Sequence, residues 1–221
     1  GLFGKFTVTL KLYPAIVTLH LLGGLFLLAL LAVQRESFLA RPLALPPALR
    51  RGAIAVLVLL TLQIALGGWV STNYAVLACG GFPTCNGRWW PDADFVNGFS
   101  LLRDLGHTAD GELLPFQALV AIHFVHRAFA LVVAVAAVAL AIGLLRQPQA
   151  GLARWGQGLL ALLAAQIASG LSNVVLQWPI VAALAHSAGA AALVLLLAVL
   201  LARSAPAAVP VRQPRPAAGL A

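Results

Sequence analysis

The sequence predicts an all-α integral membrane protein built as a bundle of five membrane-spanning helices. Of its 221 residues, 62% are hydrophobic and only 9% are charged, which exceeds what the core of a soluble domain requires. The apolar residues are gathered in runs long enough for a helix to cross about 30 Å of hydrocarbon. Helices also satisfy their own backbone hydrogen bonds, which open segments in lipid must do.

Five apolar runs qualify as spans. In chain order they cover residues 13–33, 53–72, 116–145, 152–174 and 179–202. The third run has length to spare for tilt. The chain opens on "GLFGKFTVTL", which reads as the end of a preceding span, and it contains no methionine. We therefore expect an N-terminally truncated sequence.

The charges in the loops predict the orientation. Residues 34–52 carry four arginines against one acidic residue, whereas the loop 73–115 carries five acidic residues against two arginines. Basic loops stay on the cytoplasmic side, so we expect a cytoplasmic C-terminus and an outer loop 73–115. The net charge of +8 is spread over short loops rather than one polar face, which argues against a nucleic-acid partner.

An internal repeat relates the two ends of the apolar sequence. At an offset of 166 residues, "GLFGKFTVTLKLYPAIVTLHLLGG" aligns with "IASGLSNVVLQWPIVAALAHSAGA", so that Gly4 meets Gly170 and His20 meets His186. Such a repeat predicts two similar helical units. We expect a remnant of an N-terminal four-helix half (1–33), a cytoplasmic linker (34–52), a complete C-terminal four-helix half (53–203) and a disordered cytoplasmic tail (204–221).

Four of the five histidines lie inside predicted spans, which is costly and usually marks function. The helical rise places His20, His123 and His186 about 10 Å below the outer ends of their spans, and His126 about 15 Å. Two histidines at matched depth can ligate one heme iron from both sides, and "HLLGG" and "HSAGAA" supply small residues beside the ligands. Ligation is favoured over simple hydrogen bonding between helices. His107 is expected to be a solvated loop residue.

Arg127 directly follows His126. A guanidinium here could pair with a propionate carboxylate of the heme near the outer surface.

The outer loop contains "CGGFPTCNGRWW", with both cysteines of the chain, Cys79 and Cys85. A short flexible loop in an oxidising space favours a structural disulfide. A redox-active pair is the alternative, and two cysteines without a nearby histidine make a poor zinc site. Trp89 and Trp90 fit an interfacial aromatic belt or a lid over a heme edge.

Two further segments near the outer ends of their spans have similar sequences, "QIALGGW" from Gln63 and "QIASGLS" from Gln166. Their glycines permit close helix approach. Helix packing alone explains them about as well as contact with a ligand does.

Together, "LGGWVSTNYAVLACGGFPTCNG", "AIHFVHR" and "VTLHLLGG" resemble the heme A synthase family of bacteria and mitochondria, over essentially residues 1–202. Members of this family have eight spans in two four-helix halves and oxidise the C8 methyl group of heme O to the formyl group of heme A, for cytochrome c oxidase. The resemblance implies heme b as cofactor, with His126 and His186 as iron ligands and His123 lining the pocket. It also implies that His20 faces the substrate heme O.

The resemblance has one large gap. The histidine–arginine motif of the family's N-terminal half, with its essential glutamate, is absent, and His123 stands where that motif has the glutamate. We therefore assign no catalytic residue and expect this sequence to hold heme b without catalysing by itself.

The implied partners are membrane lipid, heme O and heme O synthase, and the assembly machinery of cytochrome oxidase, with a homo-oligomer as an open option. Two other classes fit the histidines. One is a bis-histidine cytochrome b-type electron carrier, and the other is a transporter whose histidines relay protons, which would bind no heme.

Overall fold

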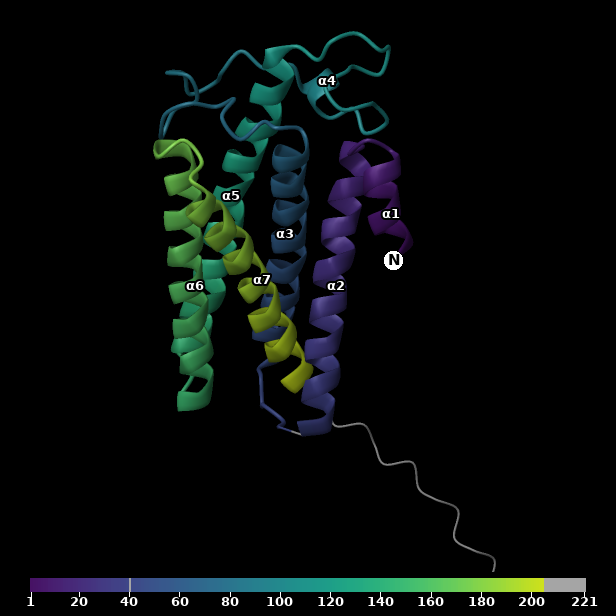
Figure 1. Cartoon of the computed structure of the whole chain (residues 1–221). Helices are drawn as coiled ribbons and strands as arrows, with labels where there is room; N and C mark the ends of the chain where they lie inside the picture. Colours follow the sequence, from purple (N-terminus) through teal and green to yellow (C-terminus); the bar gives the residue numbers. More distant parts are fainter. Residues whose placement is uncertain (40, 205–221) are drawn as a thin grey trace, which may run out of the picture.

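The computed structural model describes residues 1–39 and 41–204. Its helices are α1 (Leu2–Thr9), α2 (Pro14–Leu39), α3 (Pro47–Thr72), α4 (Phe95–Gly98), α5 (Phe116–Leu145), α6 (Ala150–Val175) and α7 (Ile180–Arg203) (Figure 1). All except α1 and α4 are long and apolar enough to cross a membrane. The described part of the chain is thus a helical membrane bundle with the five spans that the sequence predicted.

Four helices, α3, α5, α6 and α7, form a closed ring in which each packs on the next. Helices α5 and α7 lie diagonally opposite each other, and within the described residues their backbones do not approach. Helix α2 lies outside the ring against α3 and α7, and α1 packs on α2 (Figure 1). Helices α5 and α7 therefore stand on opposite sides of the axis of the ring.

The buried apolar residues of the bundle form two clusters with a layer between them. One cluster of buried apolar residues, including Leu144, Leu152 and Leu197, fills the end near the predicted cytoplasmic side. A second, including Trp69 and Cys79, lies under the outer loop. The layer between them holds half-buried polar and small residues, which are described below.

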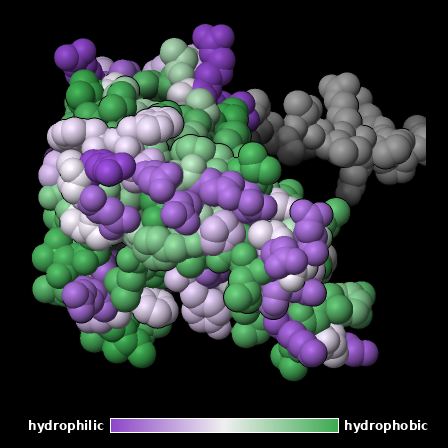
Figure 2. Space-filling model, turned by 90° about the horizontal axis from the view of Figure 1, so that it is seen from above, coloured by the Kyte–Doolittle hydropathy of each residue, from purple (hydrophilic) through white to green (hydrophobic). Residues whose placement is uncertain are grey.

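The outer loop, residues 73–115, folds over one end of the bundle (Figure 1). The indole Nε1 of Trp69 donates to the carbonyl of Gly98 at 2.9 Å and ties the short helix α4 to α3. Asp94 caps α4 by accepting hydrogen bonds from the side chain and backbone of Asn97, which lower the pKa of the Asp94 carboxyl. Figure 2 looks down on this end and shows hydrophilic side chains spread over the loops.

The predicted linker 34–52 is largely helical, because α2 continues to Leu39 and α3 begins at Pro47. Proline suits the first turn of a helix, where its missing N–H is not needed. Within α2, the buried Glu36 carboxylate binds Arg35 at 2.9 Å and Arg203 of α7 at 2.8 Å. These ion pairs stabilise the last turns of α2, which extend beyond the predicted span. Of the predicted tail 204–221, residues 205–221 lie outside the described residues.

The predicted repeat is visible in the backbone. The turn between α1 and α2 has positive φ at Lys11 (49°) and Leu12 (62°), and the turn between α6 and α7 has it at Gln177 (53°) and Trp178 (64°). In each turn the second residue donates its N–H to the carbonyl five residues earlier, at 2.9 and 2.8 Å. The two helical hairpins thus share one conformation at the offset of 166, while the domain boundaries drawn from the repeat stay a prediction.

Candidate functional site

His126 of α5 packs against the outer part of α3. The amide Nε2 of Gln63 lies 3.1 Å from its Nδ1 and donates to its backbone carbonyl at 3.1 Å. Gly67, one turn further along α3, lies so close that a Cβ there would be 3.0 Å from the His126 Cε1. The glutamine and the glycine together hold the imidazole in one place.

His186 of α7 is held by α6 in the same way. Its Nδ1 lies 3.1 Å from the Ser169 hydroxyl and 3.2 Å from the Gln166 carbonyl. A Cβ at Gly170 would be 2.9 Å from the His186 Cε1. With Nδ1 protonated, the ring donates to that carbonyl, while its Nε2 lies 3.4 Å from the amide nitrogen of the Gln166 side chain.

The two histidines lie at the same depth. Gly67 and Gly170 each stand five residues before the last residue of their helix, Thr72 in α3 and Val175 in α6, or about 7.5 Å along the axis. Both glycines make close contact with a predicted heme ligand, while the choice between helix packing and contact with a bound group stays open.

His126 and His186 belong to the diagonal pair of the ring, α5 and α7, and their imidazoles pack against α3 and α6 respectively. In the same layer, the side-chain oxygens of Gln63 and Gln166 are buried without a hydrogen-bond partner. Within the described ranges no cluster of three or more His, Cys, Asp or Glu could hold a metal ion. A planar group that needs only two protein ligands, as heme does, fits this donor set.

His20 and His123 do not join this pair. His20 is exposed on α2, outside the ring, and its ring lies beside Gly4, where a Cβ would be 3.5 Å from its Cε1. His123 is only 5% exposed, one turn nearer the outer loop than His126, and its Nδ1 has no hydrogen-bond partner among the described residues. The structure thus assigns no contact that explains His123.

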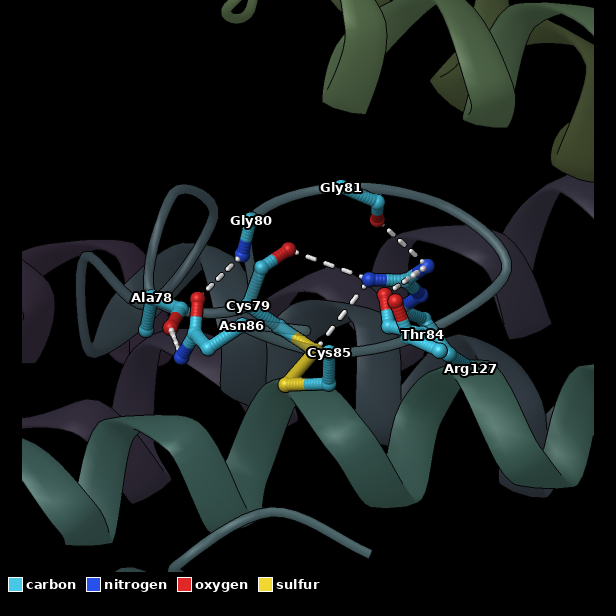
Figure 3. Close-up of a disulfide and its surroundings, with 8 residues drawn as sticks. All are labelled: Ala78, Cys79, Gly80, Gly81, Thr84, Cys85, Asn86 and Arg127. Atoms are coloured by element: carbon cyan, nitrogen blue, oxygen red, sulfur yellow. Dashed lines mark hydrogen bonds between the residues drawn. A yellow bond between two sulfur atoms is a disulfide. The ribbon is translucent and has the colours of Figure 1, made fainter. Parts of the chain in front are cut away.

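The cysteine loop is closed by a disulfide between Cys79 and Cys85, as predicted (Figure 3). Arg127 points into this loop and donates to the carbonyls of Cys79 (3.0 Å), Gly81 (2.8 Å) and Thr84 (3.4 Å). Its guanidinium also lies 3.1 Å from the Cys79 Sγ. The arginine that we expected beside a propionate therefore fastens the loop to α5, next to His126.

The two tryptophans of the loop are both largely exposed, Trp89 at 76% and Trp90 at 72%. Trp90 packs edge-on against Phe124 of α5, with ring centroids 5.4 Å apart. The predicted choice between an interfacial belt and a lid stays open.

Sequence reasoning missed the roles of Gln63, Gln166 and Ser169 as partners of the histidines. The sequence shows that the two segments beginning with "QIA" are alike, but only the packing shows which histidine each glutamine contacts. It also missed Arg103, which is 3% exposed and whose Nη2 donates to the Asn73 side chain at 2.6 Å.

The fold and the site define a class, that of multi-pass helical membrane bundles with a pair of intramembrane histidines. Comparison with known proteins narrows it, because a family model described as "Cytochrome oxidase assembly protein" matches residues 1–199. The chain belongs to this family, which is the heme A synthase family that its motifs resemble.

Three curated relatives carry the name heme A synthase. The protein of Shewanella oneidensis is 35% identical over 202 residues, which cover 89% of this chain and 60% of the relative. The protein of Methylobacterium radiotolerans is 33% identical, covering 78% and 45%, and that of Methylorubrum populi is 34% identical, covering 84% and 47%. The chain thus spans 60% or less of the length of each relative.

Proposed function

We propose that this chain is the heme-b-holding part of a heme A synthase, an oxidoreductase that converts the C8 methyl group of heme O to the formyl group of heme A. The observation that carries the proposal is the layer that brings His126 and His186 to a similar depth from diagonally opposite helices. Each is held by a glutamine and a glycine of the helix before it. The names of the relatives support the reaction class.

The residues of this layer would bind and orient the cofactor. Ser169 and the Gln166 carbonyl hold the His186 ring by Nδ1, and its Nε2, which lies 3.4 Å from the Gln166 amide nitrogen, would be the atom that binds the iron. Gly67 and Gly170 leave room for both rings, and the disulfide loop covers the outer end. When bound, the iron of heme b would supply one-electron transfer. The chain itself contributes ligands, orientation and exclusion of water.

The substrate heme O would lie beside His20, on the face of α2 that points away from the ring. No residue of this chain is assigned to the oxidation of the methyl group. We further propose heme O synthase and the cytochrome oxidase assembly machinery as partners, and a bacterial inner membrane with the cysteine loop outside and the C-terminus in the cytoplasm.

The test is an absorption spectrum of the protein purified in detergent, with His126→Gly and His186→Gly variants. The wild type should show the spectrum of a low-spin bis-histidine heme, and each variant should lose it. Added imidazole should restore the low-spin bands in the variants, which shows that they are folded. A wild type without a Soret band contradicts every heme function, and loss of the bands in His123→Gly but not in His126→Gly contradicts our choice of ligand.

A second candidate, a bis-histidine electron carrier, is favoured by one observation. The chain contains the histidine pair that such a carrier needs. Conversion of heme O to heme A in cells expressing the full reading frame separates the two functions. Heme b without conversion would support the carrier.

A further inference from the structure

Arg103 is a charged side chain inside the outer loop. It is only 3% exposed, and its guanidinium lies over the ring of Trp69 at 5.6 Å from the centroid. Its Nη2 donates to the Asn73 side chain at 2.6 Å and its Nη1 to the His107 carbonyl at 3.3 Å. The loop therefore holds this guanidinium in a defined place.

This buried charge lacks a counter-charge. Among the described residues, no carboxylate forms an ion pair with Arg103. A guanidinium has five N–H donors, and hydrogen bonds account for two of them, while Nε is buried without a partner. A guanidinium stays protonated at any pH at which a protein is folded, and burying such a charge unpaired is costly. An anionic ligand would remove this cost.

A pocket of about 480 Å³ opens beside Arg103. Its walls come from Tyr13, at the outer end of α2, and from loop residues that include His107 and Thr108. The Thr108 hydroxyl is also buried without a hydrogen-bond partner. Asp104, which lines the same pocket, is exposed and remains solvated. The pocket thus offers a buried cation and an unused hydroxyl to a ligand with a negatively charged oxygen.

The position of the pocket suggests which ligand this is. Tyr13 stands seven residues before His20, so the pocket lies about 10 Å above that histidine along α2. The segment after α4 lies over the outer ends of α1 and α2 (Figure 1). A porphyrin whose iron faces His20 would direct its carboxylates toward the outer surface at this level. We propose that the Arg103 pocket binds a carboxylate of the substrate porphyrin and fixes its orientation, a proposal that rests on the substrate site proposed above.

The chemistry of the pocket is that of a carboxylate receptor, and its ligand could be a porphyrin propionate or a small free carboxylate. Iron-free protoporphyrin IX separates this question from histidine ligation, because it retains both propionates but has no metal. We would titrate it, and its dimethyl ester, into the purified full chain and follow porphyrin fluorescence. The variants are Arg103→Gln and Thr108→Val, with Arg88→Gln as matched control, since Arg88 is an exposed arginine of the same loop.

Wild type and Arg88→Gln should bind the diacid about tenfold more tightly than the diester, the size expected for one charge-assisted hydrogen bond. Arg103→Gln should lose this preference, and Thr108→Val should reduce it. A melting temperature of Arg103→Gln within a few degrees of the wild type shows that the variant is folded. If it does not fold, Arg103→Lys, which keeps the charge, should retain the preference and Thr108→Val should still reduce it.

Three results would overturn the assignment. They are equal binding of diacid and diester by the wild type, an unchanged preference in Arg103→Gln, and no porphyrin binding at all. If sodium acetate raises the melting temperature of the wild type but not of Arg103→Gln while diacid and diester bind alike, the pocket takes a free carboxylate instead. Failure of the proposed substrate site beside His20 looks different. In that case His20→Ala would bind hemin as the wild type does, while the preference for diacid over diester would still depend on Arg103.

Discussion

Replacing Gly170 by alanine tests whether this glycine of α6 is needed to make room for the His186 ring. The new Cβ would lie 2.9 Å from the His186 Cε1, whereas ordinary contact between carbon atoms begins at about 3.5 Å. The ring would therefore have to retreat by roughly 0.6 Å. That shift would also strain the hydrogen bonds that Nδ1 makes with Ser169 and the Gln166 carbonyl.

The strain of overpacking is typically about 1–3 kcal/mol, which corresponds to roughly a 5- to 150-fold loss of affinity when it falls on the bound state. We expect Gly170→Ala to weaken heme binding by about tenfold or more and to shift the spectrum from low-spin toward high-spin. The measurement is a heme titration followed by absorbance in detergent. The effect should be specific to the ligand, because alanine otherwise favours a helix over glycine by up to about 1 kcal/mol.

Gly151→Ala is the matched control. Gly151 lies in the same helix, and a Cβ there would have no neighbour within 4 Å. This variant should bind heme as the wild type does and melt at the same or a higher temperature. If Gly170→Ala also binds heme with unchanged affinity and a low-spin spectrum, then the glycine serves helix packing alone and our account of the layer is wrong.

Three further variants probe other parts of the structure. Glu36→Gln should lower the melting temperature by about 5 °C, because it replaces a charged acceptor of Arg203 in a buried site. Glu112→Gln, at an exposed position, should have no effect. Equal melting temperatures for the two variants would show that the ion pair does not hold α2 to α7. Arg127→Gln should release the cysteine loop from α5, so that a protease cleaves residues 80–84 several-fold faster than in the wild type; an unchanged cleavage rate would contradict the clamp. Because hydrogen bonds from Asn97 lower the pKa of Asp94, its contribution to the loop is complete above about pH 4 and is lost as the pH falls through the lowered pKa. Exchange of the α4 amides should therefore accelerate in acid in the wild type but be uniformly fast in Asp94→Ala, and a wild type without this acid dependence would refute the cap.

Much of the bundle could be predicted from the sequence because the relevant property is local. A membrane of fixed thickness requires apolar runs of a certain length, so each span was found within a few residues of its observed helix at the ends that face the outer loops. The inner ends were harder. Residues 34–37 are polar, so the sequence predicts a linker from residue 34 onward, but the ion pairs of Glu36 with Arg35 and Arg203 stabilise the helix here. Arg203 lies far from Glu36 in the sequence, in α7, so the sequence does not show this pairing.

The candidate site was predicted in its chemistry but not in its contacts. Intramembrane histidines and a cysteine pair are rare enough to be recognised in a sequence. Arg127 shows the limit, because its position next to His126 suggests a propionate partner, which stays a prediction, but does not predict that its guanidinium binds carbonyls of a loop about 45 residues away. A side chain as long as arginine can reach many partners, and the sequence does not say which one the fold brings near.

The sequence by itself thus determined which segments lie in the membrane, which ionisable groups they carry with them and which family the motifs resemble. Only the tertiary structure decided that α5 and α7 are diagonal and that a glycine lies against His126 and against His186. It also decided that Arg103 is buried without a counter-charge among the described residues. The physical reason is that hydrophobicity and length act on each helix separately. Rotation and pairing, in contrast, depend on how all helices fill one bundle at the same time.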